Sequence, residues 1–221
     1  MDLSRAHCVV RMSLAVLVVA VLAAGAFPQE RPKPEEVLKH EKLEVVLPDF
    51  PAEGLILDIG GGGEGVIGQL KGKQVVAIDL IKRELEDAPG EPLLKIVMDA
   101  RDLKFLDNTF PTATVFFTFM YIDPSSHAKV FEEIRRVLKP GGRLLIWDVV
   151  FPARTDPRQA YVLFPVHVKM PKGDVNTGYG VKILEEQGME HFVDLAKQTG
   201  FEIVTREPQK GWFFLELKKP V

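Results

Sequence analysis

The sequence predicts an α/β fold: a Rossmann-like, doubly wound, seven-stranded sheet, mostly parallel with an antiparallel C-terminal strand. Three observations indicate this fold. Apolar runs alternate with amphipathic helical segments from residue 55 onward. Four consecutive glycines, Gly60 to Gly63, directly follow the first apolar run, where the chain must turn sharply into a helix. The last two apolar runs, 201–206 and 212–218, are joined by a connection too short for a parallel crossover, so they must be antiparallel.

The elements are expected in a definite order. Residues 35–47 have apolar side chains at helix-compatible spacing, and prolines at 48 and 51 end this segment. Strands are then expected at 55–59, 74–79, 93–98, 112–118, 143–150, 201–206 and 212–218. Helices are expected from about 64 to 70 and at 82–86, 125–138 and 190–199.

Residues 151–180 interrupt the alternation of strands and helices. They contain a long apolar segment, 161–170, and turn signals at 171–174 and 176–178. We therefore expect an inserted loop or hairpin over the edge of the sheet. The remainder of 35–221 reads as one domain.

Composition narrows the function further. The 221 residues carry a formal net charge of −3 and no long basic run, which disfavours nucleic-acid binding. Cys8 is the only cysteine, so an intrachain disulfide and a cysteine-based zinc site are excluded. The five histidines lack paired metal-ligand spacing, and we expect no metal.

The N-terminal segment 1–26 has the three parts of a signal peptide. Arg5 and Arg11 precede the apolar stretch 12–27, and Ala24 and Ala26 supply the small residues of a cleavage site. As a helix the stretch would reach only ~24 Å, short of a ~30 Å hydrocarbon core. If the signal is cleaved, the protein is exported, either secreted or periplasmic. An uncleaved signal anchor, which would leave the chain on a membrane, and a misassigned start codon are the alternatives. Residues 27–34 read as a linker.

The glycines and two acids predict a nucleotide-type pocket. Asp58 lies in the first apolar run, and Asp79 ends the second. Glycines allow the backbone to approach a ligand closely, and an acid about 20 residues further on suits the two hydroxyls of a ribose.

In these motifs the chain resembles the class I S-adenosylmethionine-dependent methyltransferases, in particular the small-molecule branch called type 11. The resemblance lies in residues 57–65, 77–80, 98–110 and 135–144, in the expected order and spacing. Glu64 departs from the usual pattern by occupying the place of a third glycine, although Gly65 can serve in the turn, and Pro111 stands where an acid is common.

The resemblance implies S-adenosylmethionine as cofactor and a set of residues that hold it. Asp79 would bind the ribose, and Asp99 and Ala100 would lie beside the adenine. Asp58 would either orient backbone amides or contact the ammonium group of the cofactor through water. The full expected set is Asp58, Gly60, Gly61, Gly62, Asp79, Leu80, Asp99, Ala100 and Phe119, with Met120 beside Phe119.

The sequence gives a weaker signal for the residues that bind the methyl acceptor, because a sulfonium donor needs an aligned nucleophile more than an acid or base. Its candidates are Tyr121, His127, Asp148, His167 and Tyr179, none of which the sequence singles out as catalytic. His127 could be a general base or a solvated residue of its helix. The segment 151–180 would form an acceptor-side lid.

The resemblance implies methyl transfer to a small molecule by in-line attack on the sulfonium methyl. An exported module that binds the cofactor without transferring a methyl group is the alternative. An NAD-type oxidoreductase is disfavoured, because the Gly-x-Gly-x-x-Gly spacing is absent after the first strand.

Overall fold

The computed structural model describes residues 32–184 and 187–221. The predicted signal segment 1–26 and most of the linker 27–34 lie outside the described residues, and both stay predictions. Within the described ranges, no helix is both long enough and apolar enough to cross a membrane.

The main sheet has seven strands in the order β10-β11-β7-β6-β3-β4-β5. Their bounds are Ile56–Ile59 (β3), Val75–Asp79 (β4), Leu94–Val97 (β5), Phe110–Phe116 (β6), Leu138–Val149 (β7), Glu202–Pro208 (β10) and Trp212–Lys218 (β11). Strand β11 is antiparallel to both β7 and β10, and the ladders among β3 to β7 are parallel. The predicted fold class is confirmed.

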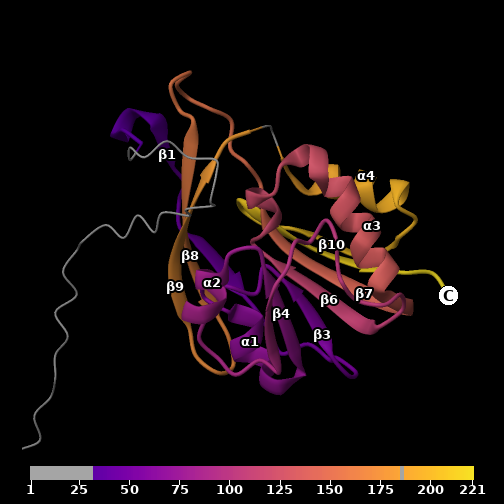
Figure 1. Cartoon of the computed structure of the whole chain (residues 1–221). Helices are drawn as coiled ribbons and strands as arrows, with labels where there is room; N and C mark the ends of the chain where they lie inside the picture. Colours follow the sequence, from indigo (N-terminus) through magenta and orange to yellow (C-terminus); the bar gives the residue numbers. More distant parts are fainter. Residues whose placement is uncertain (1–31, 185–186) are drawn as a thin grey trace, which may run out of the picture.

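Four α-helices connect these strands. They are α1 (Val66–Lys71), α2 (Lys82–Asp87), α3 (His127–Val137) and α4 (Met189–Gln198). Short 3-10 turns are found at Pro34–Glu36, Gly72–Gln74, Phe119–Tyr121 and Pro124–Ser126. Helices α3 and α4 pack against each other on one side of the main sheet, around buried Phe131, Phe192 and Phe213 (Figure 1).

The opposite side of the main sheet faces a second, four-stranded sheet. It consists of β1 (Val37–Lys39), β2 (Leu43–Val46), β8 (Tyr161–Lys169) and β9 (Val175–Lys182). Strand β8 pairs in parallel with β1 and β2 on one edge and antiparallel with β9 on the other. The insertion therefore contains a hairpin, as expected, but the hairpin packs on a face of the main sheet and not over its edge. Strands β1 and β2, which precede the glycine motif, pair with it.

The predicted helix at 35–47 is wrong. Leu43, Val45 and Leu47 are buried, at 2%, 0% and 0% exposure, whereas Val46 between them is 64% exposed. This alternation has the period of a strand, and β-branched valines favour a strand that can pack on one face. The partner that satisfies the backbone is β8, more than a hundred residues away, which a local pattern does not reveal.

The alternation in β2 gives a matched pair of substitutions. Val45→Asn should lower the free energy of unfolding by about 2–5 kcal/mol, because it replaces buried apolar surface with an amide that has no partner. Val46→Asn, on the exposed face, should change it by less than about 1 kcal/mol. Urea denaturation measures both, and equal losses would contradict the strand assignment.

Candidate active site

A cavity of about 320 Å³ opens at the carboxyl ends of the parallel strands. Its wall is built from residues that follow β3, β4, β5 and β6, together with Gly178 and Tyr179 of β9. Because the carboxyl ends of parallel strands meet at one edge of the sheet, residues far apart in sequence converge there.

The turn after β3 forms the floor of this cavity. The amides of Gly60 and Gly61 both donate to the carbonyl oxygen of Ile78, each at 2.9 Å, which ties the turn to β4. Gly60 has φ of 72°, and a Cβ there would lie 2.3 Å from Thr118 Oγ1. A Cβ on Gly62 would lie 2.7 Å from Asp79 Oδ2. The turn therefore has no room for side chains at these positions.

Two buried or half-buried acids stand beside the turn. Asp79 Oδ1 accepts a hydrogen bond from the amide of Ile81 at 2.8 Å, and burial raises the pKa of Asp79. Asp58 is 2% exposed and accepts from Thr114 Oγ1 at 2.7 Å. Burial, with a smaller contribution from the charge of Asp79, raises the pKa of Asp58 to about 7.

The cavity is rich in acids. Among the described residues, its wall contains one basic side chain, the guanidinium of Arg101, which is paired with Asp99 through Nη2 and Oδ2 at 2.6 Å. The acids of the wall are Asp58, Glu64, Asp79, Glu84, Asp99 and Asp123. Burial, and then the charges of Asp79 and Glu64, raise the pKa of Glu84. Such a wall favours a ligand that carries positive charge.

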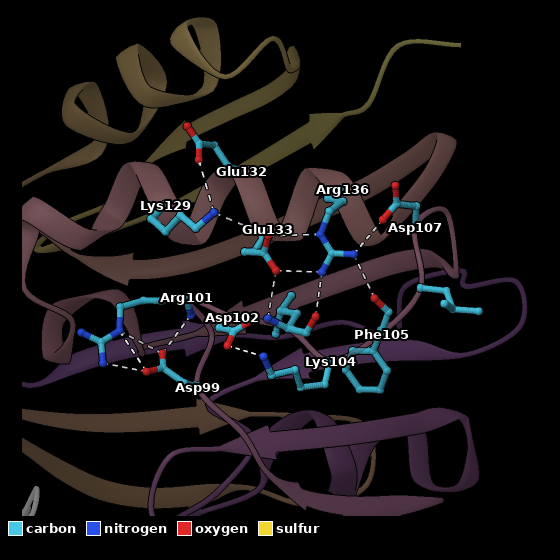
Figure 2. Close-up of polar contacts among 12 residues, drawn as sticks. Asp99, Arg101, Asp102, Lys104, Phe105, Asp107, Lys129, Glu132, Glu133 and Arg136 are labelled. Carbon is cyan, nitrogen blue, oxygen red and sulfur yellow. Dashed lines mark hydrogen bonds and ion pairs between the residues drawn. The ribbon is translucent and has the colours of Figure 1, made fainter.

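Helix α3 fixes the loop that follows β5 (Figure 2). The guanidinium of Arg136 donates to the carbonyl oxygens of Leu103 and Phe105 at 2.7 and 2.9 Å and to Asp107 Oδ1 at 2.7 Å. Glu133 Oε2 accepts from the amide of Leu103 at 2.9 Å. Glu133, which is 8% exposed, and Arg136 therefore belong to a packed network and not to a solvated helix face. These contacts hold the loop that carries Asp99 and its neighbours in the cavity wall.

An aromatic surface closes the side toward β9. The ring centroids of Phe116 and Phe117 lie 4.9 Å apart, and those of Phe117 and Tyr179 lie 5.6 Å apart and stack at 20°. Tyr121 meets Tyr179 edge-on at 6.5 Å. Burial, and then the negative charge of Glu64, raise the pKa of both tyrosine phenols, which keeps them protonated. We call Phe116, Phe117, Tyr121 and Tyr179 the aromatic wall.

Most of the residues singled out from the sequence converge on the cavity. Those in its wall are Asp58, Gly60, Gly61, Gly62, Asp79, Leu80, Asp99, Ala100, Tyr121 and Tyr179. The cavity wall does not include Phe119, Met120, His127, Asp148 or His167.

The expectation that Phe119 lines the pocket is wrong. The 3-10 turn Phe119–Tyr121 directs its ring into the core, where it is 0% exposed and packs against Phe131 and Phe192. Phe117 and Thr118, just before that turn, line the cavity instead. The sequence carried no signal for this shift, because large apolar side chains stand both before and after Thr118.

His127 is also in the core, and neither a base role at the cavity nor a solvated position fits it. Its ring is 0% exposed, with Nδ1 2.9 Å from His191 Nε2 and Nε2 3.0 Å from the carbonyl oxygen of Ile122. Burial and the neighbouring His191 lower the pKa of His127. His167 lies in the second sheet between the carboxylates of Glu44 and Asp174.

Asp148 is buried behind the cavity and acts on its shape. Its carboxylate accepts from the amides of Phe119 and Val149, both at 2.8 Å, and burial raises its pKa to about 7. It thereby holds the start of the turn that presents Tyr121. Asp148 is a positioning residue in this geometry and does not reach the cavity as the sequence-based hypothesis required.

Sequence reasoning missed several residues of the wall. Glu64, Glu84, Arg101 and Phe117 all line the cavity. Glu84 could have been found, since it lies on the first turn of the helix that follows Asp79. Phe117 could not, because its position depends on where β6 ends.

Comparison with known proteins agrees with this geometry. A family model described as a methyltransferase domain matches residues 57–146. The chain is 35% identical over 113 residues to the ubiquinone/menaquinone biosynthesis C-methyltransferase UbiE of Desulfotalea psychrophila, covering 47% of this chain and 45% of that protein. It is 29% identical over 177 residues to the demethylmenaquinone methyltransferase of Thermotoga maritima, covering 73% of this chain and 75% of that protein.

Solved structures share the fold. An S-adenosylmethionine-dependent methyltransferase of Methanosarcina mazei superposes with a TM-score of 0.54 at 20% identity, over 78% of this chain and 95% of that chain. The [4+2]-cyclase SpnF superposes with a TM-score of 0.53 at 17% identity, over 77% of this chain and 76% of that chain. At these identities the likeness shows the fold alone.

The strand order and the glycine turn at the sheet's carboxyl edge define a class I methyltransferase fold. The match of residues 57–146 to a methyltransferase-domain model and the shared fold support the resemblance to S-adenosylmethionine-dependent methyltransferases that the motifs indicated. It spans about half the length of the UbiE relatives that it matches.

The packing of the glycine turn can be tested by adding one carbon. Gly60→Ala should lower the free energy of unfolding by at least about 2 kcal/mol, because positive φ strains alanine and its Cβ meets Thr118. Thermal or urea denaturation gives the value.

Gly180→Ala in β9 is the matched control, since nothing lies within 4 Å of its added Cβ. Its stability should stay within about 1 kcal/mol of wild type. A Gly60 variant as stable as this control would show that the turn is not packed as described.

Proposed function

We propose that this protein transfers a methyl group from S-adenosylmethionine to a small-molecule acceptor bound in the same cavity. The observation that carries the proposal is the convergence of the glycine turn, the acid at the end of β4 and an excess of carboxylates on one cavity. S-adenosylmethionine has a sulfonium and an ammonium group, so an acid-rich wall complements it.

The residues fit the parts of this cofactor. The turn at Gly60 to Gly62 presents only backbone to the cavity, so the methionine portion of the cofactor could approach it closely. Asp79, at the tip of β4, would accept the ribose hydroxyls, as an acid in this position does in dinucleotide-binding folds. Asp99 and Ala100 would flank the adenine, and Asp58 would face the ammonium group.

The bound cofactor would supply an already activated methyl group on its sulfonium. The protein's part is then to hold the nucleophile in line and to exclude water, which can contribute on the order of 7–11 kcal/mol. The buried rings of Phe116 and Phe117 would help to exclude water. The turn held by Asp148 fixes Tyr121, which would help to orient the nucleophile.

The acceptor is assigned only by class. Several relatives bear the names of quinone-methylating enzymes, which supports a small organic acceptor. The match to UbiE extends over about half of each chain. The chemistry of the acceptor therefore depends on the aromatic wall and on the carboxylates beside it.

Removal of the predicted ribose ligand tests the proposal. Asp79→Ala should weaken binding of S-adenosylhomocysteine, the demethylated product, at least tenfold, since each hydrogen bond to a charged group contributes about 1.5–3 kcal/mol. Calorimetric titration measures the affinity. Transfer of an isotope-labelled methyl group into a small-metabolite extract should fall with it.

Asp87→Ala is the control for Asp79. Asp87 lies at the end of the adjacent helix, exposed and paired with Arg83, so the variant should bind like wild type. Equal affinities of both variants, or no heat with wild type, would argue against the proposed cofactor site. Binding without labelled product across the extract would favour a binding module over an enzyme.

Because the pKa of Asp58 is raised, we expect the affinity for S-adenosylhomocysteine to depend on pH. Its pKa is raised to about 7, and an ammonium ligand favours the ionised carboxylate. Affinity for S-adenosylhomocysteine should therefore rise as the pH increases from 5.5 to 7.5, on the order of tenfold, as the pH passes this pKa. Calorimetry across this range should show the rise in wild type and a flatter profile in Asp58→Asn. The same slope in both would assign the dependence to another group.

A further inference from the structure

Glu64 stands where the glycine turn meets the second sheet. It lies in the cavity wall, and its Oε1 accepts a hydrogen bond from Thr177 Oγ1 of β9. Its own carbonyl oxygen accepts from Gln69 Nε2 at 2.7 Å, which fixes the backbone at the start of α1. The hydroxyl of Tyr179 also hydrogen-bonds to the Glu64 side chain. A carboxylate can accept about four hydrogen bonds, so these two contacts leave capacity for a ligand.

The carboxylate of Glu64 shares its side of the cavity with the aromatic wall. The rings of Phe117, Tyr179 and Tyr121 form a continuous series of contacts there. Both tyrosines stay protonated, so they can donate hydrogen bonds but cannot take a proton. An anion beside π faces is the arrangement that recognises an organic cation.

The same surroundings oppose other acceptors. A carboxylate or phosphate acceptor would meet the charges of Glu64, Glu84 and Asp79. A phenol acceptor would have to become a phenolate where the protein's own phenols are held protonated. An amine acceptor is positively charged when it enters and again after methylation, so the acidic wall favours both states and the charge that develops on nitrogen between them.

We propose, on the basis of the function proposed above, that the acceptor is an organic amine and that Glu64 binds its nitrogen between the glycine turn and the aromatic wall. The protonated amine gives one proton to the Glu64 carboxylate. The freed nitrogen lone pair forms the bond to the methyl carbon, and the carbon–sulfur bond breaks with its electron pair going to sulfur. The products are the methylated ammonium ion, S-adenosylhomocysteine and one proton, which passes from Glu64 to water.

A purely structural role for Glu64 would be to tether the glycine turn to β9. Two substitutions distinguish the structural role from amine binding. Glu64→Gln keeps an oxygen that can accept from Thr177 but removes the charge. Thr177→Val keeps the charge and removes the hydrogen bond that Thr177 donates to Glu64.

The test uses the full chain saturated with S-adenosylhomocysteine and three probes of similar size: 2-phenylethylamine, 4-ethylphenol and 3-phenylpropionate. Calorimetry should show the amine binding at least about tenfold more tightly than the other two. Glu64→Gln should lose that preference when it is measured at a concentration of S-adenosylhomocysteine that saturates the variant. Thr177→Val should keep it.

The outcomes separate the two proposals. Absence of S-adenosylhomocysteine binding by wild type would overturn the proposed function and this inference with it. Normal S-adenosylhomocysteine binding with no preference for the amine, or a preference that Glu64→Gln retains, would overturn the inference alone. Loss of the preference in Thr177→Val but not in Glu64→Gln would assign Glu64 to the tether.

Discussion

The cavity depends on how closely the turn after β3 packs against its neighbours. Gly60 lies so close to Thr118, which follows β6, that a Cβ would collide with it. Gly62 lies equally close to the carboxylate of Asp79, at the end of β4. The amides of Gly60 and Gly61 donate hydrogen bonds to the carbonyl oxygen of Ile78, near the end of β4. These contacts bring three strand ends together with only backbone between them, and the open space that remains is the cavity. A single side chain in the turn would force the strand ends apart.

The second feature of the site is the gathering of like charges. Burial raises the pKa of both Asp58 and Asp79, and the charge of Asp79 adds to the shift at Asp58. Carboxyl groups so placed cost free energy when they ionise without a partner. Acidic residues with shifted pKa values in a cavity are typical of functional sites. A cationic cofactor and a cationic acceptor would supply the positive charge that stabilises the ionised carboxylates. The two networks that hold the wall, at Arg136 and at Asp148, are built from residues outside it.

The sequence predicted the main sheet and most of the cofactor side of the cavity. Runs buried on both faces, such as β7, and the glycine turn are local signals, and parallel strand ends necessarily converge. The sequence did not predict the strand nature of residues 35–47, whose pairing with β8 is non-local. Nor did it place Phe119 and His127, since apolar and aromatic neighbours at helical spacing give no indication of which side chain turns inward. Glu64 was visible as a departure from the motif, but its contact with Thr177 exists only in three dimensions.

A crystal structure of the full chain with S-adenosylhomocysteine tests the central claim most directly. The account predicts that the ligand occupies this cavity, with both ribose hydroxyls within hydrogen-bond distance of the Asp79 carboxylate and the adenine beside Asp99 and Ala100. A ligand bound elsewhere, or one in the cavity with its ribose turned away from Asp79, would contradict it.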